Sequence, residues 1–286
     1  MDITIEKVTD LNELAQFISE LNKQKTSHIG YCGEKVEDIY QTLLEDFVCE
    51  SNFLVARNYF GEMIGAIGLD IEGKSAEVWG PFNKNPSLAP QQQLWTRLIN
   101  EHPTIQNFSF FINKENEVQQ LFMNELKARK TGEHLILKMK EDDFDRVSEA
   151  SSRSFIQSDF QAFEKLHNEA FPNTYYNGKT IVERLSNQCV LKVLKSEANE
   201  LQGYAYFEGD HEMGEASLEY ITIHPKYQNQ GLGTMLLKEV LTEIFSHDQI
   251  KEIRLCVDNL NVQANHLYMK VGFKPIDILY SYNLKR

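Results

Sequence analysis

The sequence predicts an α+β protein of two domains, each with a mixed, mostly antiparallel sheet and flanking helices. Three observations support this. One order of helices and strands appears twice along the 286 residues, short sequence echoes recur at matching points, and a polar, Ser-rich segment lies between the halves. The length fits one large domain or two of middling size. The repeated order favours domains at 1–140 and 155–286 joined by a linker at 141–154.

The first half begins with an alternating strand pattern and continues through helical and strand patterns. Asp10 is a predicted N-cap of the first helix, and Pro90 falls in the first turn of the third. The predicted strands cover 3–8, 52–60, 62–72, 75–82, 107–113 and 133–140, and the predicted helices cover 10–22, 34–47, 89–102 and 115–126.

The second half repeats this order. The predicted helices cover 159–171, 180–186, 231–245 and 261–272, and the predicted strands cover 189–195, 201–209, 216–224, 251–258 and 281–286. Two echoes link the halves: Glu62-x-x-Gly65 matches Glu200-x-x-Gly203, and Leu121-Phe122-Met123 matches Leu267-Tyr268-Met269. Their shared order indicates a duplication.

Composition excludes several classes of protein. The chain is 42% hydrophobic and 25% charged, which is typical of globular proteins. Its net charge of −13 disfavours nucleic acid as a partner and suits a cationic or neutral small substrate, although solubility explains it equally well. No apolar run approaches a membrane span, and the opening MDITIEKVTD lacks the features of a signal peptide.

The cysteines give no sign of a metal site. Cys32, Cys49, Cys189 and Cys256 are scattered without metal-ligand spacing, as in a reduced cytoplasmic protein. We therefore expect a soluble cytoplasmic protein without a bound metal.

The stretch IHPKYQNQGLGTMLL, residues 223–237, joins a strand to an amphipathic helix. Pro225 ends the strand, and Gly231 and Gly233 lie at the helix start. Unpaired amides at a helix start bind anions, and glycines let an anion approach them. A tight turn explains the glycines equally well. The lysine of a P-loop and the third glycine of a dinucleotide loop are both missing.

A second motif lies downstream, after a helix and a strand. It reads Asn261-x-x-Ala264-x-x-Leu267-Tyr268-x-x-x-Gly272-Phe273. Together with Gln228-x-x-Gly231-x-Gly233, this resembles the GCN5-related N-acetyltransferase (GNAT) superfamily over residues 155–286. The first half is similar only in element order, so the chain resembles a tandem protein of two GNAT domains.

The resemblance implies that acetyl-CoA is the cosubstrate and that an amine attacks its thioester directly. It places the pantetheine arm along the strand that ends at Ile221, Thr222 and Ile223. The diphosphate would lie on the loop amides, and Asn261 would contact CoA or serve as a plain N-cap. The loop residues are Gln228, Asn229, Gln230, Gly231, Leu232, Gly233 and Thr234.

The resemblance also suggests the groups that move protons. Tyr268 occupies the position from which the family protonates the leaving thiolate, unless it only packs on the helix face. Glu219 lies two residues before Ile221 and would act as the base, through a water, or as a charge that positions substrate. His224 is a weaker candidate because it belongs to the strand-terminating turn.

The acceptor is expected to be a small-molecule or peptide amine. Tyr175, Tyr176 and Tyr206 are candidate lining residues, because aromatic rings and a carboxylate suit a cation; surface or core packing explains each equally well. With two domains in one chain, we expect a monomer or a homodimer.

The first half lacks the corresponding chemistry. Its turn at 79–90 holds three prolines and no Q-x-x-G-x-G pattern, and Phe122 matches Tyr268. Proline has no N–H to donate, so we expect no CoA binding in this half. Two alternatives to an N-acetyltransferase remain: an acyltransferase resembling mycothiol synthase, and a non-catalytic acyl-CoA-binding regulator.

Overall fold

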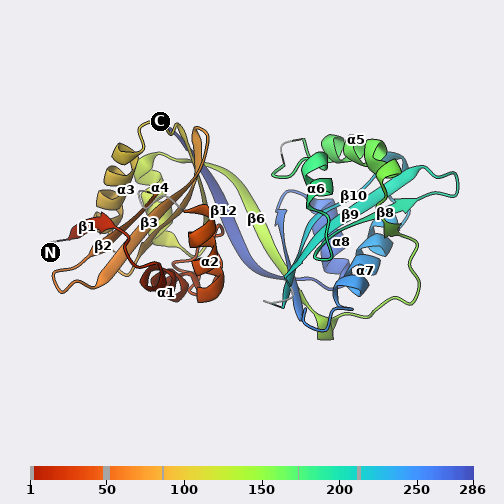
Figure 1. Cartoon of the computed structure of the whole chain (residues 1–286), viewed down its shortest axis with the longest axis horizontal. Coiled ribbons are helices and arrows are strands. Elements are labelled where there is room, and N and C mark those ends of the chain that lie inside the picture. The colour runs from red at the N-terminus through yellow and green to blue at the C-terminus, as the bar shows by residue number, and fades with distance from the viewer. Residues whose placement is uncertain (1–2, 48–51, 86, 173, 211–213) are drawn as a thin grey trace. The chain divides into compact units, whose positions relative to one another are not determined.

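The structure is a computed structural model that describes residues 3–47, 52–85, 87–172, 174–210 and 214–286. The chain divides into two compact units, Met1–Leu135 with Asp277–Arg286, and Ile136–Ile276. Both combine helices with a mostly antiparallel sheet, so the predicted fold class is confirmed (Figure 1).

The first unit has the strand order β1-β2-β3-β4-β5-β12, in which only the β4–β5 pair is parallel; β12 (Lys274–Lys285) is the last strand of the chain. Figure 1 shows α1 and α2 on one side of this sheet and α3 and α4 on the other. Its elements are β1 (Thr4–Lys7), α1 (Leu11–Asn22), α2 (Val36–Asp46), β2 (Phe53–Arg57), β3 (Met63–Glu72), β4 (Ser75–Asn83), α3 (Ala89–Glu101), β5 (Asn107–Asn113) and α4 (Glu117–Leu126).

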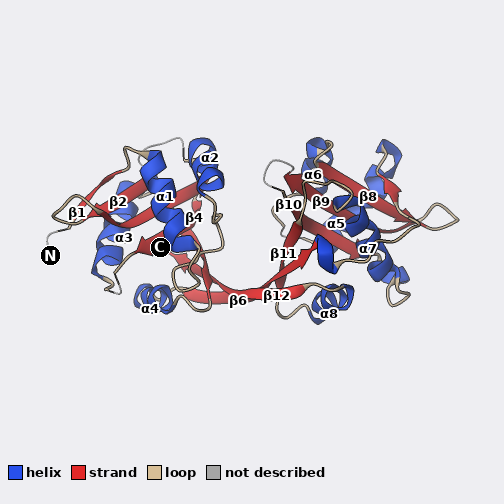
Figure 2. Cartoon of the chain, turned by 90° about the horizontal axis from the view of Figure 1, so that it is seen from below, coloured by secondary structure: helices blue, strands red, loops and turns tan. Residues whose placement is uncertain are grey.

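The second unit has the order β6-β11-β10-β9-β8-β7, in which β10 and β11 are parallel. Figure 2 draws its helices in blue and its strands in red. Its elements are β6 (Arg129–Lys140), shared with the first unit, β7 (Arg153–Ser154), α5 (Phe160–Ala170), α6 (Gly178–Arg184), β8 (Cys189–Lys195), β9 (Leu201–Asp210), β10 (Glu215–Ile223), α7 (Leu232–Ile244), β11 (Glu252–Asp258), α8 (Val262–Val271) and the first three residues of β12. Short 3-10 turns lie at Glu141–Asp143, Gln157–Asp159 and Pro225–Tyr227.

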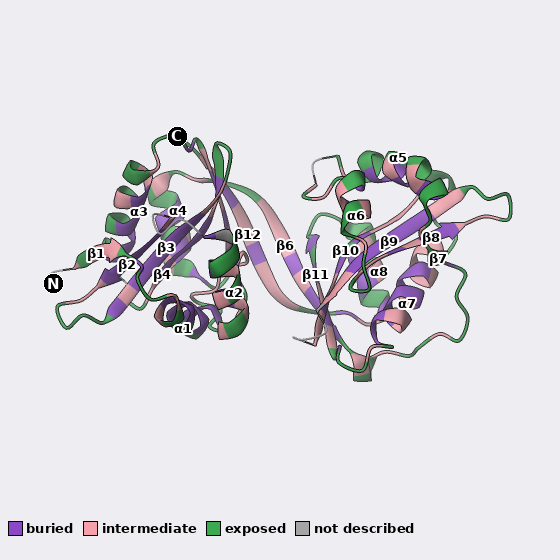
Figure 3. Cartoon of the chain, viewed as in Figure 1, coloured by how far each residue is buried: buried purple, intermediate pink, exposed green. Residues whose placement is uncertain are grey.

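Local sequence explains where the helices begin. The Asp10 side chain accepts hydrogen bonds from the amides of Asn12 and Glu13, at 2.8 and 3.1 Å, which confirms it as the N-cap of α1. Pro90 lies in the first turn of α3, as predicted. The cores form where buried strand faces meet these helices, and Figure 3 shows the buried residues running along β2 to β4 and β8 to β10.

The helix bounds correct one detail of the predicted duplication. Helices α4 and α8 each have 10 residues, and their N-caps Asn116 and Asn261 have nearly equal angles, φ −83° ψ 72° and φ −80° ψ 72°. Counted from these caps, the counterpart of Tyr268 is Met123, so matching it with Phe122 was wrong by one residue. A three-letter hydrophobic echo cannot fix helix register, whereas a capped helix can. Neither side chain carries a phenol.

Each unit is completed by a strand from the other half of the sequence. From Leu279 to Lys285, β12 pairs antiparallel with β5 of the first unit. Likewise β6 lies beside β11 in the second unit, where Leu137 and Met139 are buried. The domain bounds at 140 and 155 remain a sequence-based prediction. The compact units differ from them by assigning Asp277–Arg286 to the first unit and Ile136–Lys140 to the second.

Candidate active site

The central feature of the second unit is the separation of its two parallel strands. β10 pairs with β11 only from Glu215 to Ser217, whereas it pairs with β9 up to Ile223. A register shift between Leu218 and Tyr220 makes Glu219 the extra residue of a β-bulge, and bulges bend a strand. The far end of β10, including Ile221, Thr222 and Ile223, therefore has a backbone edge that β11 does not occupy.

The loop after β10 presents a row of unpaired amides. Gly231, at φ 81°, is the N-cap of α7, and Asn229 is also left-handed at φ 61°. Met235 N–H donates to the Gly231 carbonyl at 3.1 Å. In the described part of the chain, the amides from Asn229 to Thr234 have no acceptor, as expected at a helix start. This end also carries the positive pole of the helix dipole, so it favours an anion.

The two glycines differ in what the fold requires of them. Gly231 needs to be glycine because of its left-handed backbone, although a Cβ on it would have no atom within 4 Å. A Cβ on Gly233 would meet Ile223 Cγ1 at 3.6 Å and Leu267 Cδ2 at 3.7 Å, which are ordinary contacts. Packing therefore does not require glycine at 233, and the space is available to a ligand.

Gln228 fixes the loop to the strand. Its Nε2 donates to the Ile223 carbonyl at 2.9 Å. His224 accepts a hydrogen bond from the Lys226 amide at 3.2 Å, so its ring is part of the turn that ends the strand. Gln230 and Leu232 complete the loop and the first turn of α7, with Gln230 exposed.

Helix α8 lies against the start of α7 through Leu267, the residue before Tyr268. Leu267 contacts the Gly233 position, and the neighbouring Tyr268 is 8% exposed and packs edge-on against Phe273 at 5.6 Å. Within the described ranges the Tyr268 hydroxyl has no hydrogen-bond partner. Burial raises its pKa, so the phenol keeps its proton at neutral pH. Asn261 begins the helix as an N-cap, accepting from the Ala264 amide at 3.1 Å.

Glu219 is the acidic group at the bulge. Its carboxylate accepts a hydrogen bond from Ser217 Oγ and is open to solvent on one side. Desolvation by surrounding protein raises its pKa, and the charge of Glu208 adds to this, while Ser217 and Arg184 oppose it. Desolvation, and then the charges of Glu219 and Asp258, raise the pKa of the Cys256 thiol on β11 to about 11. Glu219 therefore acts electrostatically on the strand from which β10 separates.

Residues 153–273, which hold all of these groups, match the sequence model of the acetyltransferase (GNAT) family. This chain contains a GNAT-family domain. The resemblance inferred from the glycine turn and the Asn261–Tyr268 motif is thereby confirmed for this domain.

Solved structures share the fold over the whole chain. A GCN5-related N-acetyltransferase from Sphaerobacter thermophilus is 13% identical, with a TM-score of 0.75 over 99% of this chain and 95% of that one. A tandem GNAT protein from the clavulanic acid biosynthesis pathway is 11% identical, with a TM-score of 0.68 over 99% and 98%. A GNAT-family acetyltransferase from Colwellia psychrerythraea is 13% identical, with a TM-score of 0.58 over 99% and 100%. The chain therefore has a tandem GNAT fold.

The predicted acceptor tyrosines of the GNAT domain lie in different surroundings. Tyr175 is 82% exposed and packs edge-on against Tyr176. Tyr206 is fully buried, and its hydroxyl donates to Glu208 at 2.5 Å. The guanidinium of Arg184 lies 4.4 Å from the centre of the Tyr176 ring. Tyr176 and Tyr206 thus share one polar cluster, while Tyr175 points away to solvent.

Sequence reasoning missed the charged pair that joins these tyrosines. Arg184 Nη2 donates to both carboxylate oxygens of Glu208 at 3.0 Å. Glu208 is two residues after Tyr206 on β9, so strand alternation could have placed it on the same face. Arg184, at the end of α6, carried no signal in the sequence.

A second missed group holds the loop before α6. Buried His167 contacts the Tyr204 hydroxyl at 2.6 Å and the Tyr176 carbonyl at 2.8 Å. Burial lowers its pKa, which favours the neutral ring. The Tyr220 hydroxyl accepts hydrogen bonds from Thr174 Oγ1 at 2.6 Å and from the Tyr176 amide at 3.1 Å. These bonds fix Tyr176 beside Arg184.

Two features are absent from the described residues. No group of three or more His, Cys, Asp or Glu side chains there could hold a metal ion. No helix in the same ranges is long and apolar enough to cross a membrane.

Proposed function

We propose that the GNAT domain transfers the acetyl group of acetyl-CoA to a primary amine of a small molecule or peptide. The observation that carries the proposal is the start of α7. The amides from Asn229 to Thr234 are unpaired, and the space beside Gly233 is open although packing against Ile223 and Leu267 does not require a glycine there. These features suit the diphosphate of CoA, and residues 153–273 match the GNAT family.

The remaining groups suit direct transfer. The free edge of β10, at Ile221 to Ile223, offers backbone groups to the pantetheine arm and a donor to the carbonyl oxygen as charge develops on it. The amine nitrogen attacks the thioester carbon, the new C–N bond forms, and the C–S bond breaks. Tyr268 gives its proton to the departing thiolate, and the thiol of CoA is released.

Glu219 accepts the proton lost by the amine, directly or through a water. Desolvation raises its pKa, which makes it a stronger base than an ordinary glutamate. Glu208 is mostly neutralised by Arg184, so Glu219 supplies the charge that attracts a cationic amine. Tyr176 and Tyr206 lie beside this pair, and Tyr175 is less favoured because it points to solvent.

The first unit is proposed not to bind CoA. Its α3 begins after Leu88, which has a right-handed backbone, and Pro90 in the first turn lacks an N–H. No glycine stands there. Pro86, another proline of this turn, lies outside the described residues.

The test combines CoA titration with thiol release across a panel of amines. Gly233→Glu places a carboxylate where the diphosphate would lie and should abolish both binding and turnover. Ala89→Glu adds the same charge at the matching helix start of the first unit and should change neither. Tight CoA binding without turnover on any amine would favour a regulator. Turnover confined to an amino-acyl acceptor would favour a peptide-forming acyltransferase.

A further inference from the structure

The first unit contains a cavity of about 430 Å³ that the proposed acetyl transfer does not use. It lies where β4 separates from β5, whose parallel pairing ends at Glu77 and Ser109. Its walls come from the end of α1 and the following loop, the end of β4, and the starts of α3 and α4. The volume is within the usual range for small-molecule sites.

Two glutamines give the cavity a specific chemistry. Gln91 is 1% exposed and Gln119 is 2% exposed, and the Oε1 atom of each is buried without a hydrogen-bond partner. Gln119 Nε2 donates to the Pro81 carbonyl at 2.7 Å. A carbonyl only accepts, so this bond fixes the amide orientation and leaves Oε1 as the free atom. A buried acceptor without a donor is costly, so a donor from water or from a bound ligand would stabilise both oxygens.

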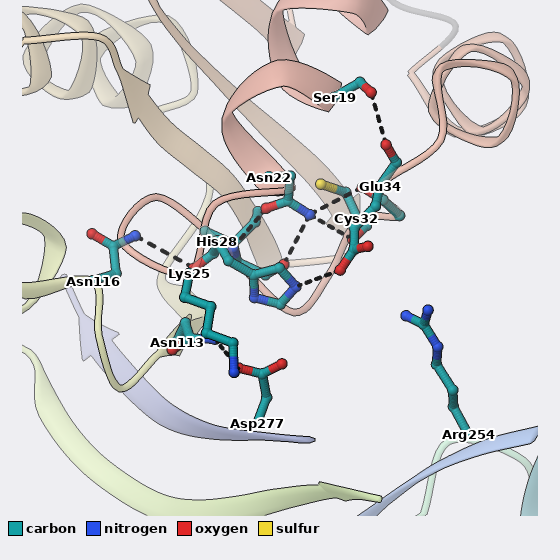
Figure 4. A network of polar contacts seen from close by, with 12 residues as sticks. Ser19, Asn22, Lys25, His28, Cys32, Glu34, Asn113, Asn116, Arg254 and Asp277 are labelled. Carbon is teal, nitrogen blue, oxygen red and sulfur yellow. Dashed lines mark hydrogen bonds and ion pairs between the residues drawn. The ribbon is translucent and has the colours of Figure 1, made fainter. Parts of the chain in front are cut away.

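One wall of the cavity is held in place by a buried asparagine. Asn22 accepts from the Ile29 amide at 2.7 Å and donates to the carbonyls of Cys32 and Gly33 at 2.9 and 3.0 Å (Figure 4). Asn116 reaches the same loop by donating to the His28 carbonyl at 3.4 Å. The loop between these contacts contributes Gln24, Thr26 and Ser27 to the lining, so the site is already formed before a ligand enters.

The charges of the cavity argue against a phosphate. Among its lining residues, Lys84 forms an ion pair with Glu20 at 2.8 Å, and each neutralises the other. The unpaired side-chain atoms of its lining, Gln91 Oε1 and Gln119 Oε1, are carbonyl oxygens, which repel anionic oxygens. The ligand should instead be neutral and rich in donors.

We propose that this cavity binds a small neutral molecule whose N–H or O–H groups donate to Gln91 and Gln119, as a primary amide or a polyol would. The site is independent of acetyl transfer, because it lies within the first unit and shares no residue with the GNAT domain at 153–273.

The test uses the full-length protein and saturation-transfer NMR with four probes. Malonamide and glycerol carry the required donors, malonate is the anionic counterpart of malonamide, and CoA reports the other site. We expect malonamide or glycerol to bind and malonate not to bind. Gly233→Glu should abolish CoA binding without affecting the neutral probe, so this inference and the proposed function can fail separately.

Gln119→Met removes the acceptor while keeping the side-chain length. It should weaken binding of the neutral probe about three- to tenfold, as expected for one lost hydrogen bond. Gln120→Met is the matched control, since Gln120 is the next residue on α4 and bonds the Lys114 carbonyl outside the cavity. Thermal unfolding of both variants checks that they are folded.

Three results would overturn the proposal. The first is no saturation transfer to either neutral probe, which would indicate a cavity that holds water only. The second is an equal loss of affinity for the neutral probe in Gln119→Met and Gln120→Met, and the third is displacement of the neutral probe by CoA in the wild type.

Discussion

Replacing Gly233 with alanine separates a ligand requirement from a folding requirement. The new methyl group would lie 3.6 Å from Ile223 and 3.7 Å from Leu267, so nothing in the protein has to move. Gly233 is helical, and alanine is the better helix former by about 0.5–1 kcal/mol in a helix interior. The free energy of unfolding should therefore stay unchanged or rise by up to about 1 kcal/mol.

CoA binding should respond in the opposite direction. We expect the methyl group to lie over the first-turn amides, where it would keep a diphosphate from one of them. A hydrogen bond to a charged group contributes about 1.5–3 kcal/mol, so the Kd for CoA should rise about 10- to 150-fold. Gly231→Ala is the informative comparison. Gly231 has a φ of 81°, so an alanine there should lower the free energy of unfolding by about 1 kcal/mol.

The assay pairs urea unfolding with calorimetric titration of CoA on each variant. Gly233→Ala should be as stable as the wild type and bind CoA more weakly, whereas Gly231→Ala should be less stable. Wild-type affinity in a fully folded Gly233→Ala protein would refute the diphosphate cradle.

Four further predictions concern other parts of the molecule. Tyr268→Phe should lower kcat about 10²- to 10⁴-fold with little change in CoA affinity. Tyr282 is equally buried, and Tyr282→Phe should leave kcat unchanged. Equal kcat values for the two variants would remove Tyr268 from the mechanism. Because the Glu219 pKa is raised above 4.5, kcat/KM should fall as pH drops through a value above 4.5, and an identical pH profile in Glu219→Gln would exclude it as the base. Burial alone would raise the pKa of Asp159, but hydrogen bonds from Arg153, Lys195 and the Ile156 amide lower it from 3.8 to about 2. Its contribution of about 2 kcal/mol to the free energy of unfolding is therefore present above pH 3.8 and lost as the pH falls through 2. Asp159→Asn should flatten this part of the acid unfolding curve, and an unchanged curve would contradict this role of Asp159. Expressed alone, a fragment 141–286 differs from the fragment 136–286 only by residues of β6, which include the buried Leu137 and Met139. It should therefore unfold about 3–6 kcal/mol more easily, and equal stability would contradict the place of β6 in the second unit.

Features with local causes were readable from the sequence. The strand before Pro225, the glycines at the start of α7 and the asparagine cap of α8 depend on neighbouring residues only, and the structure has each of them. The fold class followed from the repeated order of such elements. The role of the loop in binding remains a prediction, because the geometry shows its capacity and not its ligand.

Features with distant causes were not readable. The alternating pattern of β12 is the same whether it pairs within its own half or with β5. The sequence therefore could not predict that β12 pairs with a strand of the first unit. The pairing of Arg184 with Glu208 depends on how α6 lies against β9. Likewise the cavity at Gln91 and Gln119 depends on three separate segments meeting, and polar residues at these helix positions would ordinarily be assigned to the surface.

The central claim is one acyl-CoA site per chain, built at the start of α7. Calorimetric titration of full-length protein with CoA tests it most directly, with Gly233→Glu and Ala89→Glu measured alongside. We expect one CoA per chain in the wild type and in Ala89→Glu, and none in Gly233→Glu. Two CoA molecules per chain, or binding that survives Gly233→Glu and is lost in Ala89→Glu, would contradict it.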